Sequence, residues 1–131
     1  MNEKNKEKDI EALRKRIYDF VIQVVNLVKE LPDNLIGNRI GGQLLDAATS
    51  VGANFEEAYA AYSHADFTSK LGIAKKEAYE TNYWLRVIRD TELLPKKRMV
   101  SIIQESDEIK KILTASVKTA QANRKNAKKI K

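Results

Sequence analysis

Four glutamates in the middle of the chain stand at spacings from which carboxylates could bridge metal ions: Glu56, Glu57, Glu77 and Glu80. Helical bundles build di-iron sites from inward-facing glutamates together with two Glu-x-x-His pairs. The single histidine, His64, does not follow Glu77 or Glu80 by three residues. We therefore expect no metal site and no cofactor.

Glu77 and Glu80 have a simpler interpretation as members of a structural polar network. Buried polar groups need hydrogen-bond partners, and Ser50 and Asn54 offer such partners on the preceding helix. Hydrogen bonds of this kind would fix the register of the two helices.

Catalytic patterns are also missing from the sequence. The chain has no cysteine, which excludes disulfides, thiolate zinc sites and cysteine nucleophiles. No G-x-S-x-G is present, one histidine cannot form a triad, and Gly41-Gly42 lacks the lysine and spacing of a phosphate-binding loop. His64, beside a capping serine, is expected to be a solvated junction residue. We expect no catalytic residue and a protein that is not an enzyme.

Basic residues are concentrated at the C-terminus. The net charge of +6 comes entirely from the tail, because the other 18 Lys and Arg balance 18 Asp and Glu. From residue 118 onward, the cations are Lys118, Arg124, Lys125, Lys128, Lys129 and Lys131, and no acidic residue occurs. Such an arm predicts an anionic partner such as nucleic acid, bound through its phosphates. The alternative is a frayed helix end whose cations suit the helix dipole and solubility.

Two further groups could assist a nucleic-acid partner. Lys96, Lys97 and Arg98 form a basic cluster at a predicted helix start, where the helix dipole disfavours cations. Tyr79 and Tyr83 could stack on bases, although the sequence does not separate them from ordinary surface aromatics.

Apolar residues repeat at alternating steps of three and four in four segments, as in helices that pack on other helices. These seams run over residues 10–31, 40–62, 67–88 and 99–120. No segment alternates with period two, so strands are not expected. Four such helices joined by short loops predict an all-α, antiparallel, up-down-up-down four-helix bundle.

Capping residues and prolines mark the expected ends of the helices. Asp9 is expected to cap the first helix and Pro32 to end it. The second helix is expected to begin within residues 33–38. The S-x-x-D spacing at Ser63 predicts that the third helix begins just after it, and Pro95 fits the first turn of the fourth.

These signals predict a flexible N-terminus over residues 1–8, a bundle over 9–122 and a basic tail over 123–131. No run approaches the roughly 18 apolar residues of a membrane span, and the first residues lack the apolar core of a signal peptide. We expect a soluble, cytoplasmic protein with no membrane association.

The second and third helices carry more apolar surface than one bundle seam requires. Tyr59 and Trp84 could simply lie over the bundle surface, as scattered apolar residues often do. An aromatic and aliphatic strip with a few embedded carboxylates is more typical of an interface core than of a solvated face, which predicts a homo-oligomer. The expected interface residues are Leu45, Thr49, Gly52, Glu56, Tyr59, Ile73, Trp84 and Val87.

Between residues 43 and 88 stand four segments in a specific order: ATSVGANFEEA, SHADF, IAKKEAYET and YWL. They resemble the "four helix bundle protein" family, also called the 23S rRNA intervening-sequence proteins. The resemblance implies a left-handed antiparallel bundle that assembles as a homopentamer. Members were first noticed as reading frames within sequences that interrupt bacterial 23S rRNA genes. The fold is similar to the pentameric accessory protein of diversity-generating retroelements, which binds nucleic acid and a reverse transcriptase.

The resemblance implies a class of partner and no reaction. Relatives often carry a basic residue just before the small-residue run, where this chain has Asp46. That difference moves the expected nucleic-acid contacts from the second helix to the tail. Two functions stay open: a non-enzymatic homo-oligomer that binds RNA or DNA non-specifically through its basic arm, and a protein–protein interaction scaffold with no nucleic-acid role.

Overall fold

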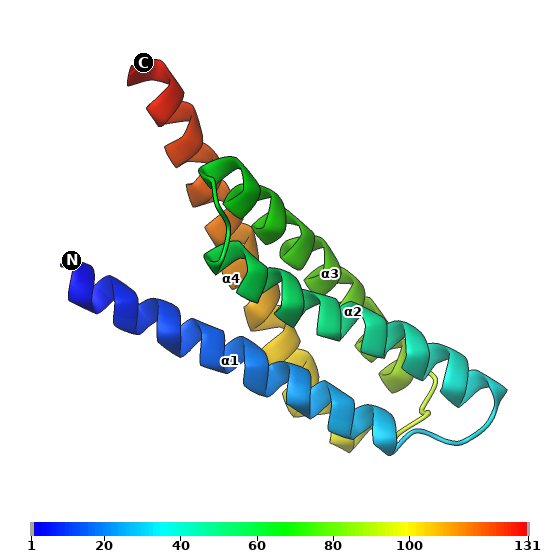
Figure 1. The fold of residues 1–131 in the computed structure, drawn as a ribbon. Coiled ribbons are helices and arrows are strands. Elements are labelled where there is room, and N and C mark those ends of the chain that lie inside the picture. The colour runs from blue at the N-terminus through cyan, green and yellow to red at the C-terminus, as the bar shows by residue number, and fades with distance from the viewer. Residues whose placement is uncertain (1, 131) are drawn as a thin grey trace.

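The computed structural model describes the backbone of residues 2–130 and the side chains of residues 2–126. It contains four helices: α1 (Glu3–Lys29), α2 (Leu35–Tyr59), α3 (His64–Asp90) and α4 (Lys96–Ile130). Consecutive helices run in opposite directions (Figure 1), and no described segment is a strand. The expected all-α four-helix bundle is confirmed. Within the described residues, no helix has the length and apolar content needed to cross a membrane.

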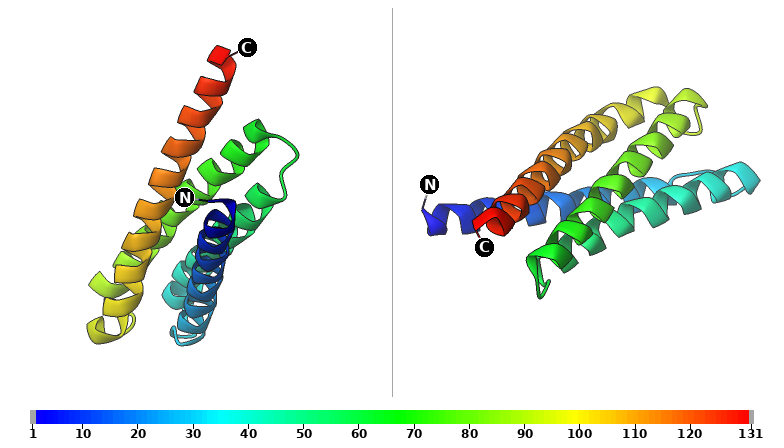
Figure 2. Two further views of the ribbon diagram at one scale, coloured as in Figure 1. Left: turned by 90° about the vertical axis from the view of Figure 1, so that its left-hand side faces the viewer. Right: turned by 90° about the horizontal axis from the view of Figure 1, so that it is seen from above.

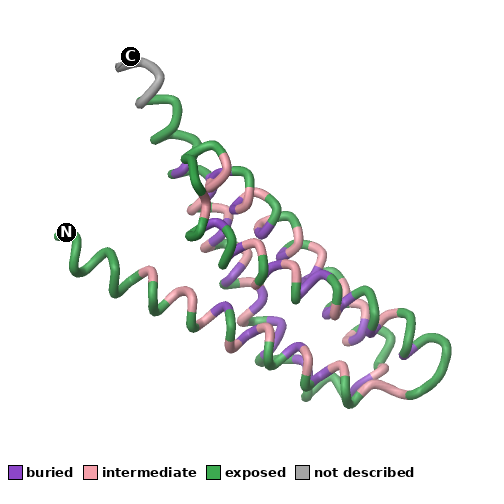
Figure 3. The backbone as a smooth tube through the Cα atoms, in the orientation of Figure 1, coloured by how far each residue is buried: buried purple, intermediate pink, exposed green. Residues whose placement is uncertain are grey.

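Buried residues occur on all four helices (Figure 3) and follow the predicted seams. Each large apolar side chain that is fully buried stabilises the fold by roughly 1.5–3 kcal/mol relative to exposure. The largest fully buried side chains include Phe20, Leu27, Leu44, Phe55, Leu71, Leu85, Met99 and Leu113. The bundle is therefore held by one apolar core to which every helix contributes.

Two predicted helix ends are wrong. Helix α1 begins at Glu3, because the side chain of Asn2 caps it by accepting from the Asn5 amide, and the expected cap Asp9 lies inside the helix. Asparagine caps as well as aspartate does, and Glu3 adds a favourable charge in the first turn. Helix α2 ends at Tyr59, so Tyr62 leaves the predicted seam and is fully exposed.

Two other predicted helix starts are confirmed, and Pro95 lies directly before α4. The Ser63 hydroxyl accepts a hydrogen bond from the Asp66 amide at 3.1 Å, and α3 starts directly after it. Asn34, inside the predicted interval, caps α2 by accepting from the Gly37 amide at 2.9 Å. The short junction that ends at Ser63 places α2 and α3 side by side.

The four helices do not pack equally. Helices α2 and α3 each pack along two neighbours, whereas α1 and α4 make the least contact of the four adjacent pairs. The last turns of α4 project beyond the other helices (Figures 1 and 2). Because consecutive helices alternate in direction, both chain ends lie at the same end of the bundle, where α1 and α4 diverge (Figure 1).

Candidate nucleic-acid interface

The basic arm covers residues 118–131 of the sequence, and its residues 118–130 form the C-terminal part of α4, which projects from the bundle (Figure 2). Lys118, Arg124 and Lys125 are exposed, and none forms an ion pair with another described residue. The helix dipole favours cations at this end. The arm therefore presents uncompensated positive charge on a helix. The predicted contacts Lys128, Lys129 and Lys131 lie outside the residues whose side chains are described.

In the body of the protein, the part that precedes the arm, four basic residues are paired with glutamates across helices. Arg14 binds Glu56 and Arg16 binds Glu105, each with a shortest N–O distance of 2.6 Å. Glutamates on neighbouring helices thus neutralise cations of the body. The contrast with the arm agrees with the charge balance of the sequence.

The predicted cluster at the start of α4 is divided by its pairings. Arg98 binds both carboxylate oxygens of Glu30, with a shortest distance of 2.6 Å, and this hydrogen bonding lowers the pKa of Glu30. Lys96 lies 3.6 Å from Glu92. Lys97 is the member that pairs with no other described residue. Arg98 therefore joins α4 to the end of α1, and the cluster lies at the opposite end of the bundle from the arm (Figure 1).

On α2, the predicted interface residues face α1 of the same chain. A Cβ added at Gly52 would lie 3.0 Å from the Val21 side chain, and Glu56 is held by Arg14. A cleft of about 210 Å³ remains between the two helices. Its walls include Arg14, Tyr18, Thr49, Gly52 and Glu56. Contact with α1 thus explains much of the second apolar stripe on α2.

The two aromatics expected at the interface are partly covered by their own chain. Tyr59 is 36 % exposed, and its ring packs edge-on against Phe55 and Phe67, at 5.1 and 5.3 Å between centroids. Burial raises the pKa of the Tyr59 phenol. Trp84 packs against the core and donates its indole N–H to Glu80 at 3.4 Å. Neither ring requires a second copy of the chain to shelter it.

The remaining predicted interface residues differ in exposure. Leu45 and Val87 are half-buried, and Thr49 is exposed with its hydroxyl donating to the Leu45 carbonyl at 2.8 Å. Ile73 is 38 % exposed on α3. Among the eight predicted residues, Ile73 is the aliphatic side chain most available to a partner.

The predicted polar network forms two pairs, each within one helix. The Asn54 side-chain amide donates to the carbonyl and the hydroxyl of Ser50, at 2.9 and 3.0 Å. On α3, burial and then the neighbouring Glu80 carboxylate raise the pKa of Glu77. No hydrogen bond between described residues runs from either glutamate to Ser50 or Asn54. Residues three or four apart on one helix are near neighbours, and this explains the local pairing.

A polar cluster that does join two helices centres on Asn82, which is buried. Its amide nitrogen donates to Ser106 at 3.2 Å and to Asp107 at 2.9 Å, both on α4. Its oxygen accepts from Arg86 at 3.0 Å and from Lys110 at 3.4 Å. Sequence reasoning missed this cluster, although a serine at position 106 of an apolar seam was the available signal.

The exposed tyrosines of α3 lie beside these cations. The Lys110 ammonium is 4.7 Å from the centre of the Tyr79 ring, and the Tyr79 hydroxyl is 3.4 Å from the Thr114 hydroxyl. The Arg86 guanidinium carbon is 5.9 Å from the centre of the Tyr83 ring. Aromatic rings and cations therefore alternate along the boundary between α3 and α4.

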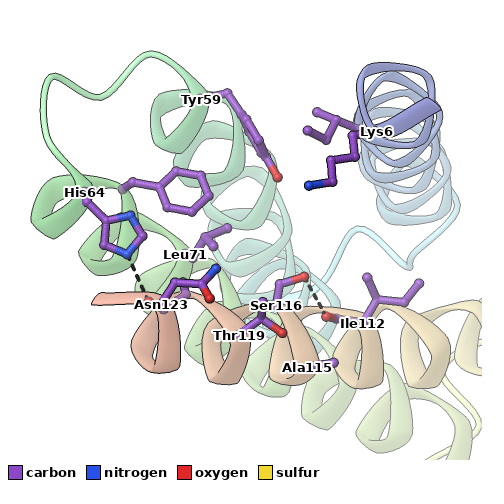
Figure 4. Close-up of a pocket in the computed structure, with 12 residues that line it drawn as sticks. Lys6, Tyr59, His64, Leu71, Ile112, Ala115, Ser116, Thr119 and Asn123 are labelled. Atoms are coloured by element: carbon purple, nitrogen blue, oxygen red, sulfur yellow. Dashed lines mark hydrogen bonds between the residues drawn. The ribbon is translucent and has the colours of Figure 1, made fainter. Parts of the chain in front are cut away.

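A larger cleft of about 600 Å³ opens where α1 and α4 diverge, and Lys6 extends over it (Figure 4). Its apolar walls include Ile10, Tyr59, Phe67, Leu71, Ile112 and Ala120. His64 closes one side, because its Nε2 donates to the Ala120 carbonyl at 2.9 Å. His64 is exposed at the start of α3, as expected of a junction residue, and it also links α3 to α4.

Acidic and histidine side chains do not gather into a metal site in the described part of the chain, where no group of three such residues is close enough to hold an ion. The four glutamates of the sequence hypothesis are instead distributed. Glu56 and Glu57 pair with Arg14 and Lys70, and Glu80 with Trp84.

The whole arrangement can be compared with known proteins. The sequence matches the 23S rRNA-intervening sequence protein family over residues 8–115. The chain belongs to this family. The fold is also similar to a crystal structure from Bacteroides thetaiotaomicron, described as a protein with unknown function from the S23 ribosomal protein family. The two chains are 38 % identical with a TM-score of 0.75, and the similarity covers 83 % of this chain and 97 % of the other. No curated protein matches the chain.

The family match confirms the resemblance drawn from the small-residue run and the segments after it. It ends at residue 115. The basic arm therefore lies outside the matched region, whereas Tyr79, Tyr83 and their cations lie inside it.

Proposed function

We propose that this family member is a non-enzymatic, cytoplasmic homo-oligomer that binds RNA or DNA with little sequence preference through its basic arm. The observation that carries the proposal is the concentration of the net positive charge in the arm, where Lys118, Arg124 and Lys125 are exposed and pair with no other described residue. Contacts to phosphates are electrostatic and do not read sequence. The family's name refers to 23S rRNA, and RNA is therefore the first ligand to test.

Assembly would strengthen weak contacts made by single arms. Linked binding sites act at a high effective concentration, so several arms on one oligomer would bind one strand more tightly than a free subunit does. The family resemblance favours a homopentamer. Each arm projects from one end of its bundle. A ring of parallel subunits would therefore display its arms on the same side.

The test neutralises the arm without shortening it. Deleting residues 118–131 would remove the buried Ala120 and the carbonyl that His64 binds, so substitution is the cleaner change. We expect Lys118→Gln/Arg124→Gln/Lys125→Gln to weaken binding to a labelled single-stranded RNA. The measurement is fluorescence anisotropy at several salt concentrations. For the unaltered protein, log affinity should fall with log salt by up to about 0.7 per neutralised phosphate.

The matched control removes the same charge outside the predicted nucleic-acid contacts. Lys29→Gln/Arg39→Gln/Lys76→Gln changes one exposed cation on each of α1, α2 and α3. This variant should bind RNA almost as the unaltered protein does. Equal loss in both variants would reduce the effect to net charge, and unchanged binding in the arm variant would contradict the proposal.

The larger cleft supports a second candidate function, a scaffold for another protein. Its apolar walls and its volume of about 600 Å³ are suited to side chains of a partner helix, a common mode of peptide recognition. Copurification with one protein, resistant to high salt and free of nucleic acid, would favour this candidate over the first.

A further inference from the structure

We propose that Tyr79 and Tyr83 form a stacking platform for unpaired bases, so that the nucleic acid bound by this protein is single-stranded. The inference rests on the proposed nucleic-acid function and specifies the form of its ligand. It concerns a surface inside the family-matched region, distinct from the arm.

The two rings have the exposure that stacking needs. Tyr79 is 47 % exposed and Tyr83 is 49 % exposed. They are four residues apart on α3, so they lie on one face and about 6 Å apart along the helix axis. Tyr83 also packs edge-on against Trp84, at 4.9 Å between ring centres. Each ring is held by neighbours while much of its surface stays open to solvent.

Each tyrosine has its own cation. Lys110 lies over Tyr79 and Arg86 lies beside Tyr83, at 4.7 and 5.9 Å from the ring centres. Asn82 accepts from both cations and thereby orients them. Asp107 is 4.0 Å from the Lys110 nitrogen and offsets part of its charge. Arg86 donates its Nε to Asn82, and its terminal nitrogens form no hydrogen bond with another described residue.

The platform is continuous with the arm along one flank of α4. Lys110, Thr114 and Lys118 follow at steps of four, so they share this flank over about 12 Å. The bond between the Thr114 and Tyr79 hydroxyls places that flank next to the platform. Lys125 continues the line seven residues after Lys118. A strand whose phosphates follow these lysines would bring its bases to the tyrosines.

Base stacking selects single strands because the faces of paired bases inside a duplex are already covered. Every base has an aromatic face, and stacking on protein rings is therefore tolerant of sequence. Single-stranded binding proteins combine such rings with a basic track in the same way. The platform thus fits a ligand bound without sequence preference.

The experiment compares one labelled RNA strand with the same strand annealed to its complement. The unaltered protein should bind the single strand more tightly than the duplex. The variant Tyr79→Ala/Tyr83→Ala should lose about tenfold or more in affinity for the single strand, with little change for the duplex. Tyr79→Phe/Tyr83→Phe keeps both rings and should stay within about twofold of the unaltered protein. The matched control, Tyr18→Ala/Tyr62→Ala, removes two other exposed rings and should bind normally.

The outcomes separate the platform from the proposed function. If the alanine variant of the platform binds the single strand normally while the arm variant loses binding, the platform is wrong and the arm stands. Equal loss in the alanine and phenylalanine variants would also overturn the platform, because the hydroxyls rather than the rings would then matter. An unaltered protein that binds neither form of RNA overturns both proposals. Circular dichroism of each variant confirms that the helices are intact.

Discussion

At the scale of single residues, Glu77 has an acidic group in an unfavourable setting. Burial disfavours its charged form, and the nearby Glu80 carboxylate adds repulsion, so the pKa of Glu77 is raised. The folded state consequently holds the Glu77 proton more tightly than the unfolded chain does. Stability must then decrease as pH rises from the ordinary glutamate pKa of 4.5 through the raised value.

We therefore predict that Glu77→Gln stabilises the protein at neutral pH. Glutamine resembles the protonated carboxyl group, so the gain should disappear as pH falls to the ordinary glutamate pKa and below it. Thermal unfolding followed by circular dichroism at several pH values measures the effect. Glu7→Gln, on the exposed first part of α1, controls for the loss of one negative charge. A gain that persists unchanged in acid would contradict the assignment.

At the scale of one element, two of the four glycines in α2 have opposite roles. A Cβ at Gly37 would overlap the Pro32 carbonyl oxygen, so the tight junction before α2 requires glycine there. A Cβ at Gly42 would meet no atom within 4 Å. Glycine inside a helix costs about 1 kcal/mol relative to alanine, and at Gly42 nothing offsets that cost within the subunit.

We predict that Gly42→Ala raises the free energy of unfolding by up to about 1 kcal/mol. Gly37→Ala should lower it by about 1–3 kcal/mol, because the backbone must move to relieve the overlap. Urea denaturation of the two variants and of the unaltered protein measures both changes. Destabilisation by Gly42→Ala would show that this position packs closely against another subunit.

The sequence predicted the helices well because their evidence is local. The seams of α3 and α4 needed only the spacing of apolar residues, and Ser63 needed only its neighbours to be recognised as a cap. The prediction that Asp9 caps α1 was wrong because Asn2, about two turns earlier, is an equally good cap, and sequence alone does not rank the two.

The candidate sites could be predicted only in part, because they depend on how the helices are rotated against one another. The arm was visible as a run of charge, and its exposure follows from its place on α4. The ion pair between Arg98 and Glu30 and the hydrogen bonds from Asn82 to α4 join residues far apart in the chain. No spacing rule links positions 30 and 98, so those roles required the fold.

At the scale of the whole molecule, the wide apolar faces of α2 and α3 have an explanation within one subunit. These two helices each pack along two neighbours, whereas α1 and α4 make the least contact of the adjacent pairs. The inner helices of such an arrangement need broader apolar arcs than the outer ones. The case for self-association therefore depends on the apolar side chains that stay exposed, among them Ile73.

We predict that Ile73→Asp dissociates the oligomer. An interface core does not tolerate an unpaired buried charge, and Ile73 is exposed enough in the subunit for aspartate to leave the fold intact. Light scattering coupled to size-exclusion chromatography measures the mass. Val100→Asp is the matched control, because Val100 is 65 % exposed and lies outside the predicted interface. An oligomer that survives Ile73→Asp would move the interface elsewhere.

The even number of antiparallel helices has a practical consequence for work with this protein. Since the chain returns to the end of the bundle at which it started, an affinity tag or fluorescent fusion at either terminus sits next to the large cleft and the projecting turns of α4. A label meant to leave that region undisturbed belongs in the loop between Glu30 and Asn34 or the loop between Thr91 and Pro95. Immobilisation through those loops would leave the opposite pole of the molecule facing the solution.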